Sequence, residues 1–162
     1  MEPLSIDEIR GSFVNSTRSL VKAMTPPPKF TDLPWESLDF LGWRDPKAPN
    51  RGYLVVRRTD GVTGIALNTQ ATTKPRRGTG LCDLCTTAHQ VTEVALFAAR
   101  RAGTAGREGN TVGTYICADL ACSLYLRGLR DPEVPQGETI APELRIERLT
   151  TRLDTFVTRV LA

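Results

Sequence analysis

The sequence predicts an α+β fold in which helices begin and end the chain and β-hairpins lie between them. Three observations support this prediction: apolar residues at helical spacing near both termini, two β-rich runs around an Asp-Gly pair, and four cysteines confined to the second half. A chain of 162 residues suffices for one domain or for two small modules with a shared core. We expect residues 1–77 and 78–162 to form two such modules within one continuous compact unit.

A helix over residues 6–23 is the first element expected. Ser5 and Glu8 have the spacing of a capping box, in which each side chain reaches the other residue's free backbone N–H. Three prolines at residues 26–28 end the helix, because proline lacks an N–H and moves its predecessor away from helical backbone angles. Apolar residues recur at helical spacing around a polar gap at residues 15–18: Ile6, Ile9, Phe13, Leu20 and Val21.

The segment from residue 31 to residue 50 holds two tryptophans among prolines and acidic residues. It predicts a short turn or helix near residues 35–40 that packs on the core. Burial is the commoner state of a large aromatic side chain, so we expect Trp35 and Trp43 to be buried. Exposure as recognition residues is the alternative.

A β-hairpin is expected between residues 51 and 68. The runs 53–56 and 62–67 are rich in strand-forming residues and flank Asp60-Gly61. Asp-Gly between two such runs is a common hairpin turn. This part of the chain therefore predicts two antiparallel strands.

The last element expected is an amphipathic helix over residues 144–161 that follows Pro142. Docking of its apolar stripe on the chain's own core is the expectation, and binding of a partner through the stripe is the alternative. Six apolar residues form the stripe: Ile146, Leu149, Leu153, Phe156, Val157 and Val160.

The four cysteines form a C-x2-C pair and a C-x4-C pair separated by 31 residues: Cys82, Cys85, Cys117 and Cys122. Two thiolates at such spacing can converge on one tetrahedral Zn²⁺ ion, and a second pair closes the coordination shell. Thiols inside the cell are usually reduced, which favours zinc over disulfides. A closed shell leaves no position for water, so we expect one structural zinc ion per chain.

The segment between the cysteine pairs predicts a hairpin. Residues 91–99 and 112–116 flank a glycine-rich loop at 103–110. Residues 95–101 alone favour a helix, but the tight glycine-rich return favours a hairpin. Residues 119–127 predict a helix whose first turn carries the second cysteine pair. Zinc knuckle, hairpin and ligand-bearing helix is the order of a treble-clef finger.

The run TVGTYICADLACSLYLRG at residues 111–128, with CDLC at residues 82–85 upstream, resembles the FBP family. These are bacterial elongation factor G-binding proteins with a C-terminal treble-clef zinc finger, and they include the FusB-type fusidic-acid resistance proteins. Residues 38–47 are also similar to family members, so the resemblance covers most of the chain. It implies that the four cysteines bind zinc and that the finger contacts elongation factor G. Resistance members use aromatic and lysine residues for this contact, and residues 103–111 contain neither.

Catalytic motifs are missing from the sequence. His89 is the only histidine, and it has no acid at the H-x-E spacing of zinc deaminases. We expect it to be an exposed or hydrogen-bonded residue after the zinc knuckle. Asp119 has the position of a favourable charge at a helix N-terminus, with a general base as the alternative. The sequence therefore predicts a protein that is not an enzyme.

Two functions remain open. The leading one is a noncatalytic zinc-stabilised protein that engages elongation factor G, the ribosome or both and modulates factor release. The alternative is an RNA- or rRNA-binding zinc-finger protein, because residues 44–107 carry 11 basic and 4 acidic residues. The partner-contact candidates, on the finger loop and the helix after it, are Arg107, Asn110, Arg127 and Arg130. The phosphate-contact candidates are Arg57, Arg58, Arg76, Arg77, Arg100 and Arg101.

The basic connector at residues 74–80 predicts either a phosphate contact or a solvated linker. The first residues resemble no secretion signal, and no apolar run reaches the roughly 18 residues needed to span a membrane. We therefore expect a cytoplasmic monomer without membrane contact.

Overall fold

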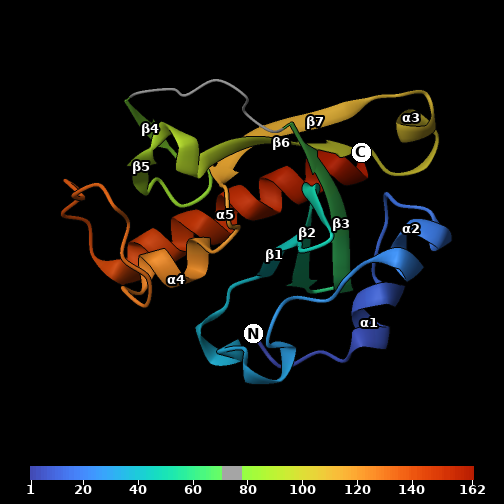
Figure 1. Ribbon diagram of the computed structural model, residues 1–162, viewed down its shortest axis with the longest axis horizontal. Coiled ribbons are helices and arrows are strands. Elements are labelled where there is room, and N and C mark those ends of the chain that lie inside the picture. Colours follow the sequence, from blue (N-terminus) through green and yellow to red (C-terminus); the bar gives the residue numbers. More distant parts are fainter. Residues whose placement is uncertain (71–77) are drawn as a thin grey trace.

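The computed structural model describes residues 1–70 and 78–162. Its strands lie in one antiparallel sheet of order β1-β2-β3-β6-β7 and in a small two-stranded sheet, as Figure 1 shows. The strands are β1 (Leu41–Asp45), β2 (Ala48–Arg58), β3 (Gly61–Thr69), β4 (Thr79–Leu81), β5 (Ala88–Gln90), β6 (Val94–Arg100) and β7 (Thr111–Cys117). The large sheet takes strands from both halves of the chain.

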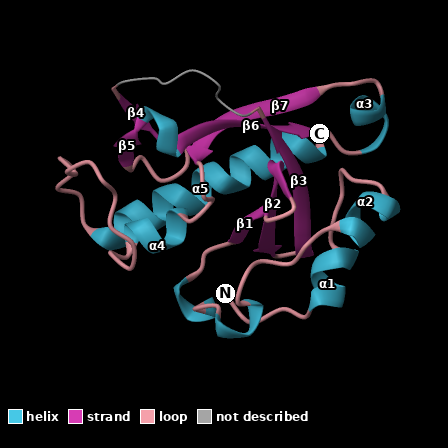
Figure 2. Cartoon of the chain, viewed as in Figure 1, coloured by secondary structure: helices cyan, strands magenta, loops and turns pink. Residues whose placement is uncertain are grey.

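Helices lie on both faces of the large sheet, and Figure 2 distinguishes them from the strands by colour. The α-helices are α1 (Ile6–Gly11), α2 (Arg18–Ala23), α3 (Gly103–Arg107), α4 (Cys122–Leu126) and α5 (Pro142–Leu161). The 3₁₀ turns are η1 (Phe30–Asp32), η2 (Trp35–Ser37) and η3 (Val91–Glu93). The α+β class with a C-terminal helix is confirmed. Within the described residues, no helix is long and apolar enough to cross a membrane.

The large sheet separates two apolar clusters. Successive side chains of a strand point to opposite faces, and β2 shows the division. Leu54 and Val56 belong to the cluster that contains α5 and the four cysteines. Tyr53 and Val55 belong to the cluster beneath the N-terminal segment. The cysteine region therefore shares a core with strands from the first half of the chain.

The prediction of a single helix over residues 6–23 is wrong. Two helices, α1 and α2, are separated by a turn and bends, where Phe13 forms an isolated bridge to Gly64 of β3. A Cβ atom on Gly64 would lie 2.5 Å from Ser12 Oγ, so glycine permits this approach. Asn15 donates to the carbonyls of Ala66 and Arg100, and Thr17 caps α2. The polar gap in the sequence is thus a point of attachment to the sheet.

The region of the tryptophans differs in part from the expectation. The short turn exists as η2, but the strand β1 that follows it was not expected. Trp43 lies on β1, is buried, and donates from Nε1 to the Thr25 carbonyl at 2.9 Å. Trp35 is half-buried and its ring meets that of Phe30 edge to face. Burial is therefore complete for one tryptophan and partial for the other.

The two expected hairpins and the terminal helix are confirmed. Strands β2 and β3 pair through a turn at Thr59 and Asp60, and β6 pairs with β7 over seven residues. The loop between β6 and β7 contains the short helix α3, which was not expected. Helix α5 buries five of the six residues of the expected stripe, and Ile146 is half-buried. Most of the basic connector, residues 74–77, lies outside the described residues.

Candidate metal centre

The sulfur atoms of Cys82, Cys85, Cys117 and Cys122 converge at one buried point. All four lie within 4.8 Å of one another. The closest pairs are Cys85–Cys117 at 3.5 Å, Cys117–Cys122 at 3.6 Å and Cys82–Cys122 at 3.7 Å. All four residues are fully buried. The structure therefore brings together the complete set of cysteines that the spacing singled out.

These separations match a tetrahedral zinc site. With Zn–S bonds of about 2.3 Å, the edge of an S₄ tetrahedron is about 3.8 Å. A disulfide would instead require an S–S distance of about 2.05 Å, and the four cysteines are free thiols. The donor set and its geometry fit one structural zinc ion with no ligand position left for substrate or water.

The first ligand pair sits at the tip of the β4–β5 hairpin. The backbone N–H of Cys85 points at Cys82 Sγ from 3.4 Å, and the N–H of Thr86 donates to the Cys82 carbonyl. Thr86 has a φ of 57°, a left-handed conformation that costs a residue with a branched Cβ about 1–3 kcal/mol. This turn aims both sulfur atoms at the same point.

The second ligand pair differs from the expectation that both cysteines lie in the first turn of a helix. Cys117 is the last residue of β7, and only Cys122 begins α4. Between them Leu120 has a φ of 60°, which reverses the chain so that the two sulfur atoms meet. The C-x4-C spacing therefore reflects a strand end and a helix start joined by a tight turn.

Residues around the sulfur atoms restrict them further. His89 Nε2 lies 3.3 Å from Cys117 Sγ, and the imidazole is buried with its ring edge to face against Tyr125. The Thr87 hydroxyl lies 3.2 Å from Cys85 Sγ. Groups that hydrogen-bond to metal ligands fix their orientation and raise affinity for the metal. The sequence analysis expected His89 to be either exposed or hydrogen-bonded, and the structure shows it hydrogen-bonded beside the site.

The thiols influence one another's ionisation. Hydrogen bonds from the other three thiols, that of Cys117 foremost, hold the pKa of Cys85 far below its ordinary value. The pKa of Cys122 is raised, mainly by its hydrogen bond with Cys117 and then by the remaining thiols. The thiolate form of Cys85 is therefore stabilised, whereas ionisation of Cys122 is disfavoured. A divalent cation bound among the sulfur atoms would favour the thiolate form of all four cysteines.

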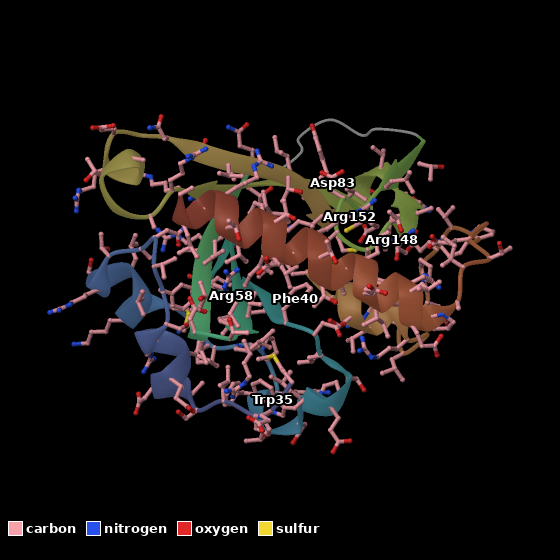
Figure 3. The ribbon with its side chains drawn as sticks, turned by 180° about the vertical axis from the view of Figure 1, so that it is seen from behind. Trp35, Phe40, Arg58, Asp83, Arg148 and Arg152 are labelled. Atoms are coloured by element: carbon pink, nitrogen blue, oxygen red, sulfur yellow. The ribbon has the colours of Figure 1, made fainter. Side chains whose placement is uncertain are left out.

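Helix α5 is attached to the zinc knuckle by two arginines, which Figure 3 labels with Asp83. Arg152 donates to the Asp83 carbonyl at 2.9 Å, and Arg148 contacts the Thr86 hydroxyl while pairing with Glu138. The Asp83 carboxylate accepts from the Tyr115 N–H at 2.7 Å on β7. Knuckle, hairpin and terminal helix are therefore connected through polar contacts as well as through the core.

The second ligand turn also contacts the first half of the chain. A Cβ atom on Gly42 of β1 would lie 2.6 Å from the Leu120 carbonyl oxygen and 2.9 Å from Leu120 Cβ. Only glycine allows this approach of the turn to the sheet. The metal centre is thus packed directly against β1, far from it in sequence.

The partner-contact candidates fall into two groups. Arg107 and Asn110 are exposed at the end of the β6–β7 hairpin. Arg127 forms two hydrogen bonds with the Asp39 carboxylate, at 2.6 and 2.9 Å. Arg130 pairs with Asp119 at 2.5 Å, and that carboxylate also accepts from the Tyr125 hydroxyl. The guanidinium groups of Arg127 and Arg130 are therefore engaged within the chain, with Asp39 as the acceptor for Arg127 and Asp119 as the acceptor for Arg130.

The structure does not gather the phosphate-contact candidates on one surface. Arg57 faces Glu2 at 3.5 Å and Arg58 pairs with Asp154 at 2.5 Å. Both lie near the C-terminal end of β2. With a rise of about 3.3 Å per strand residue, Arg58 is roughly 23 Å from Arg51 near the other end of the strand. Arg100 is the last residue of β6 and Arg101 follows it, on the other side of the large sheet's β3 strand from β2. The remaining two, Arg76 and Arg77, are outside the described residues.

One surface feature was missed by sequence reasoning. Leu96 of β6 and Tyr115 of β7 face each other across the strands, and they are 49% and 48% exposed. Their neighbours Phe97 and Ile116 point to the opposite face and are buried against the α5 side. The alternation of these strands is the sequence signal that could have found the pair.

The comparisons with known proteins agree with this geometry. A family model described as FBP C-terminal treble-clef zinc-finger matches residues 8–160. No curated protein and no solved structure shows significant similarity to the chain. The match extends from helix α1 to the end of helix α5 and includes the four cysteines, the hairpin between them and the strands of the first half. The chain belongs to the FBP C-terminal treble-clef zinc-finger family.

Proposed function

We propose that this chain is a noncatalytic, zinc-stabilised binding protein that engages elongation factor G in the cytoplasm and modulates its release from the ribosome. The observation that supports this proposal is the exposed pair Leu96 and Tyr115 on the hairpin of the zinc finger. The chain belongs to the FBP zinc-finger family, and its sequence resembles the elongation factor G-binding proteins of that family. Apolar and aromatic residues that stay exposed on a rigid element are common anchors of protein interfaces.

The position of the pair supports an interface rather than a core. The N-terminal segment covers this face of the sheet over β2 and β3, where Tyr53 and Ala66 contact it. Over β6 and β7 the same face is open at Leu96 and Tyr115. Both side chains project from paired strands, so they lose little conformational freedom on binding. Arg107 and Asn110 at the end of the hairpin would form a polar rim.

The chemistry of the metal centre supports the noncatalytic part of the proposal. Four thiolates complete a tetrahedral shell, which leaves zinc no position for an activated water. His89 and Asp119, the two candidates for proton transfer, hold Cys117, Tyr125 and Arg130 in place. These contacts support a structural role for both residues.

Binding to purified elongation factor G, measured by isothermal titration calorimetry, tests the proposal. We expect the wild type to bind and Leu96→Ser with Tyr115→Ser to weaken binding more than about tenfold, since central apolar anchors dominate such interfaces. Leu144→Ser, at a residue that is 57% exposed on α5, is the matched control and should bind like the wild type. Zinc content and thermal unfolding show that each variant is folded.

Absence of binding by the wild type would reject elongation factor G as the partner. Equal binding by the wild type and the double variant would reject this surface. Salt distinguishes the RNA-binding alternative, because phosphate contacts weaken steeply between low and moderate salt whereas an apolar interface weakens less.

A further inference from the structure

A cleft of about 460 Å³ lies away from the metal centre, between the N-terminal segment and the end of the large sheet. Helices α2 and α3 border it from two sides, and Figure 1 shows both at the same end of the molecule. Sites for small molecules commonly have volumes of about 300–1,000 Å³. The cleft is therefore large enough for a ligand of the size of a mononucleotide.

Four arginines from three parts of the chain line this cleft. Arg51 comes from β2, Arg100 and Arg101 from the end of β6, and Arg107 from α3. No aspartate or glutamate lines the cleft. Across the described part of the chain, none of these four guanidinium groups forms an ion pair, whereas Arg58, Arg127 and Arg148 do. The cleft is thus lined by four arginines whose charges no carboxylate of the described residues neutralises through an ion pair.

The wall opposite these arginines is held in place by Asn15. Its side-chain amide donates to the carbonyls of Ala66 at 3.0 Å and Arg100 at 2.9 Å, and it accepts from the Ala66 N–H at 2.8 Å. These bonds attach the N-terminal segment across β3 and β6. The cleft is therefore part of the rigid fold, and its arginines need not be gathered by the ligand.

The lining defines the chemistry of the ligand. A guanidinium group offers planar pairs of N–H donors that match the oxygens of a phosphate group. Val14 and Leu20, 36% and 43% exposed, provide apolar surface on the N-terminal side of the same cleft. A ligand that joins a phosphate group to an apolar or planar group would match both the arginines and the apolar surface. A long RNA strand would need a track of basic residues, and Arg57 and Arg58 lie far away with acidic neighbours.

We propose that this cleft binds a small phosphate ester of nucleotide size, with Arg51, Arg100, Arg101 and Arg107 around the phosphate. Arg107 also belongs to the polar rim proposed above, but the variants that test the cleft change Arg51 and Arg100 only, so this proposal can fail without the function proposed above failing.

Isothermal titration calorimetry at low salt tests the site with four probes: ADP, pyrophosphate, adenosine and a single-stranded RNA decamer lacking terminal phosphate. We expect ADP and pyrophosphate to bind and adenosine to bind at least about tenfold more weakly than ADP. Arg51→Gln with Arg100→Gln should weaken ADP binding more than about tenfold. Lys47→Gln with Arg159→Gln removes the same charge from exposed positions outside the cleft and should leave ADP binding within about twofold of the wild type.

A second pair of variants guards against loss of folding. Arg51→Lys with Arg100→Lys keeps the charge but loses the planar donor pairs, and we expect an intermediate affinity for ADP. Three results would each overturn the proposal: no binding of ADP or pyrophosphate, adenosine binding as tightly as ADP, or equal loss in the control variant. RNA binding more than about tenfold tighter than ADP would replace the small ligand with a nucleic acid.

Discussion

His89 shows how one residue can affect the metal centre without being a ligand. Its Nε2 lies 3.3 Å from Cys117 Sγ, where an N–H donor stabilises a thiolate. We predict that His89→Leu, which fills the space without a donor, weakens zinc retention by about 10–100-fold. His89→Gln keeps a donor and should lose less. Competition with a chromophoric zinc chelator measures both, and a His89→Leu protein that holds zinc like the wild type would show the contact to be only packing.

Asp45 is the clearest buried charge outside the metal centre. Burial opposes its ionisation, but the backbone N–H groups of Lys47 and Thr25 and the Tyr53 hydroxyl donate to it. These bonds hold the pKa of Asp45 below its ordinary value of 3.8. Burial, and then the hydrogen bond to Asp45, raises the pKa of Tyr53 to about 12.

The lowered pKa of Asp45 predicts a defined pH dependence of stability. Because the folded pKa lies below the unfolded one, the carboxylate stabilises the fold above about pH 4, and this contribution is lost as pH falls through the folded pKa. We predict that Asp45→Asn lowers the free energy of unfolding at pH 7 by roughly 1–3 kcal/mol. The difference from the wild type should shrink below pH 4. Urea denaturation at pH 7 and pH 3.5 measures it, and an equal difference at both pH values would contradict the assignment.

At the scale of elements, the contact between the second ligand turn and β1 predicts the effect of one methyl group. Gly42→Ala would place Cβ 2.6 Å from the Leu120 carbonyl oxygen, so backbone must shift. We predict a loss of roughly 1–3 kcal/mol in the free energy of unfolding. Gly11→Ala is the matched control, since nothing lies within 4 Å of that position, and it should be neutral or stabilising. Urea denaturation of both variants decides, and an unchanged stability of Gly42→Ala would refute the close contact.

The same elements show what sequence patterns can and cannot predict. The Asp-Gly turn of β2–β3, the stripe of α5 and the spacing of the cysteines are local signals, and each was confirmed. The break between α1 and α2 depends on Gly64 and on a carbonyl of β6, which lie far away in sequence. Strand β1 was missed because its partner β2 supplies its hydrogen bonds. The sequence singled out the adjacent pair Arg100 and Arg101 as phosphate-contact candidates, but only the folded sheet brings Arg51 and Arg107 to the same cleft.

On the scale of the whole molecule, the metal centre joins both halves of the chain. Its ligands come from the β4–β5 hairpin, β7 and α4, while β6 continues the sheet that begins with β1, β2 and β3. Arg58 of β2 pairs with Asp154 of α5 at the surface, and Figure 3 labels Arg58 and Phe40 beneath the terminal helix. Structural zinc contributes directly to folding free energy in such sites.

This connection predicts that removal of zinc destabilises the entire chain. Hydrogen exchange with and without a zinc chelator should show loss of protection in β1–β3 as well as in the cysteine region, because both share one core. Addition of zinc should restore protection in both. Loss confined to residues 78–126, with β1–β3 unchanged, would show instead that the two halves unfold separately.

Native mass spectrometry of the chain mixed with elongation factor G tests the zinc-stabilised binding function most directly, because one spectrum reports both metal and partner. We predict a complex whose mass equals the two chains plus one zinc ion, and free chain that also carries one zinc. Acidified, denaturing spray should release the metal and lower the mass by one zinc. A spectrum in which the chain carries no zinc, or in which the two proteins remain separate at every ratio, would contradict the assignment.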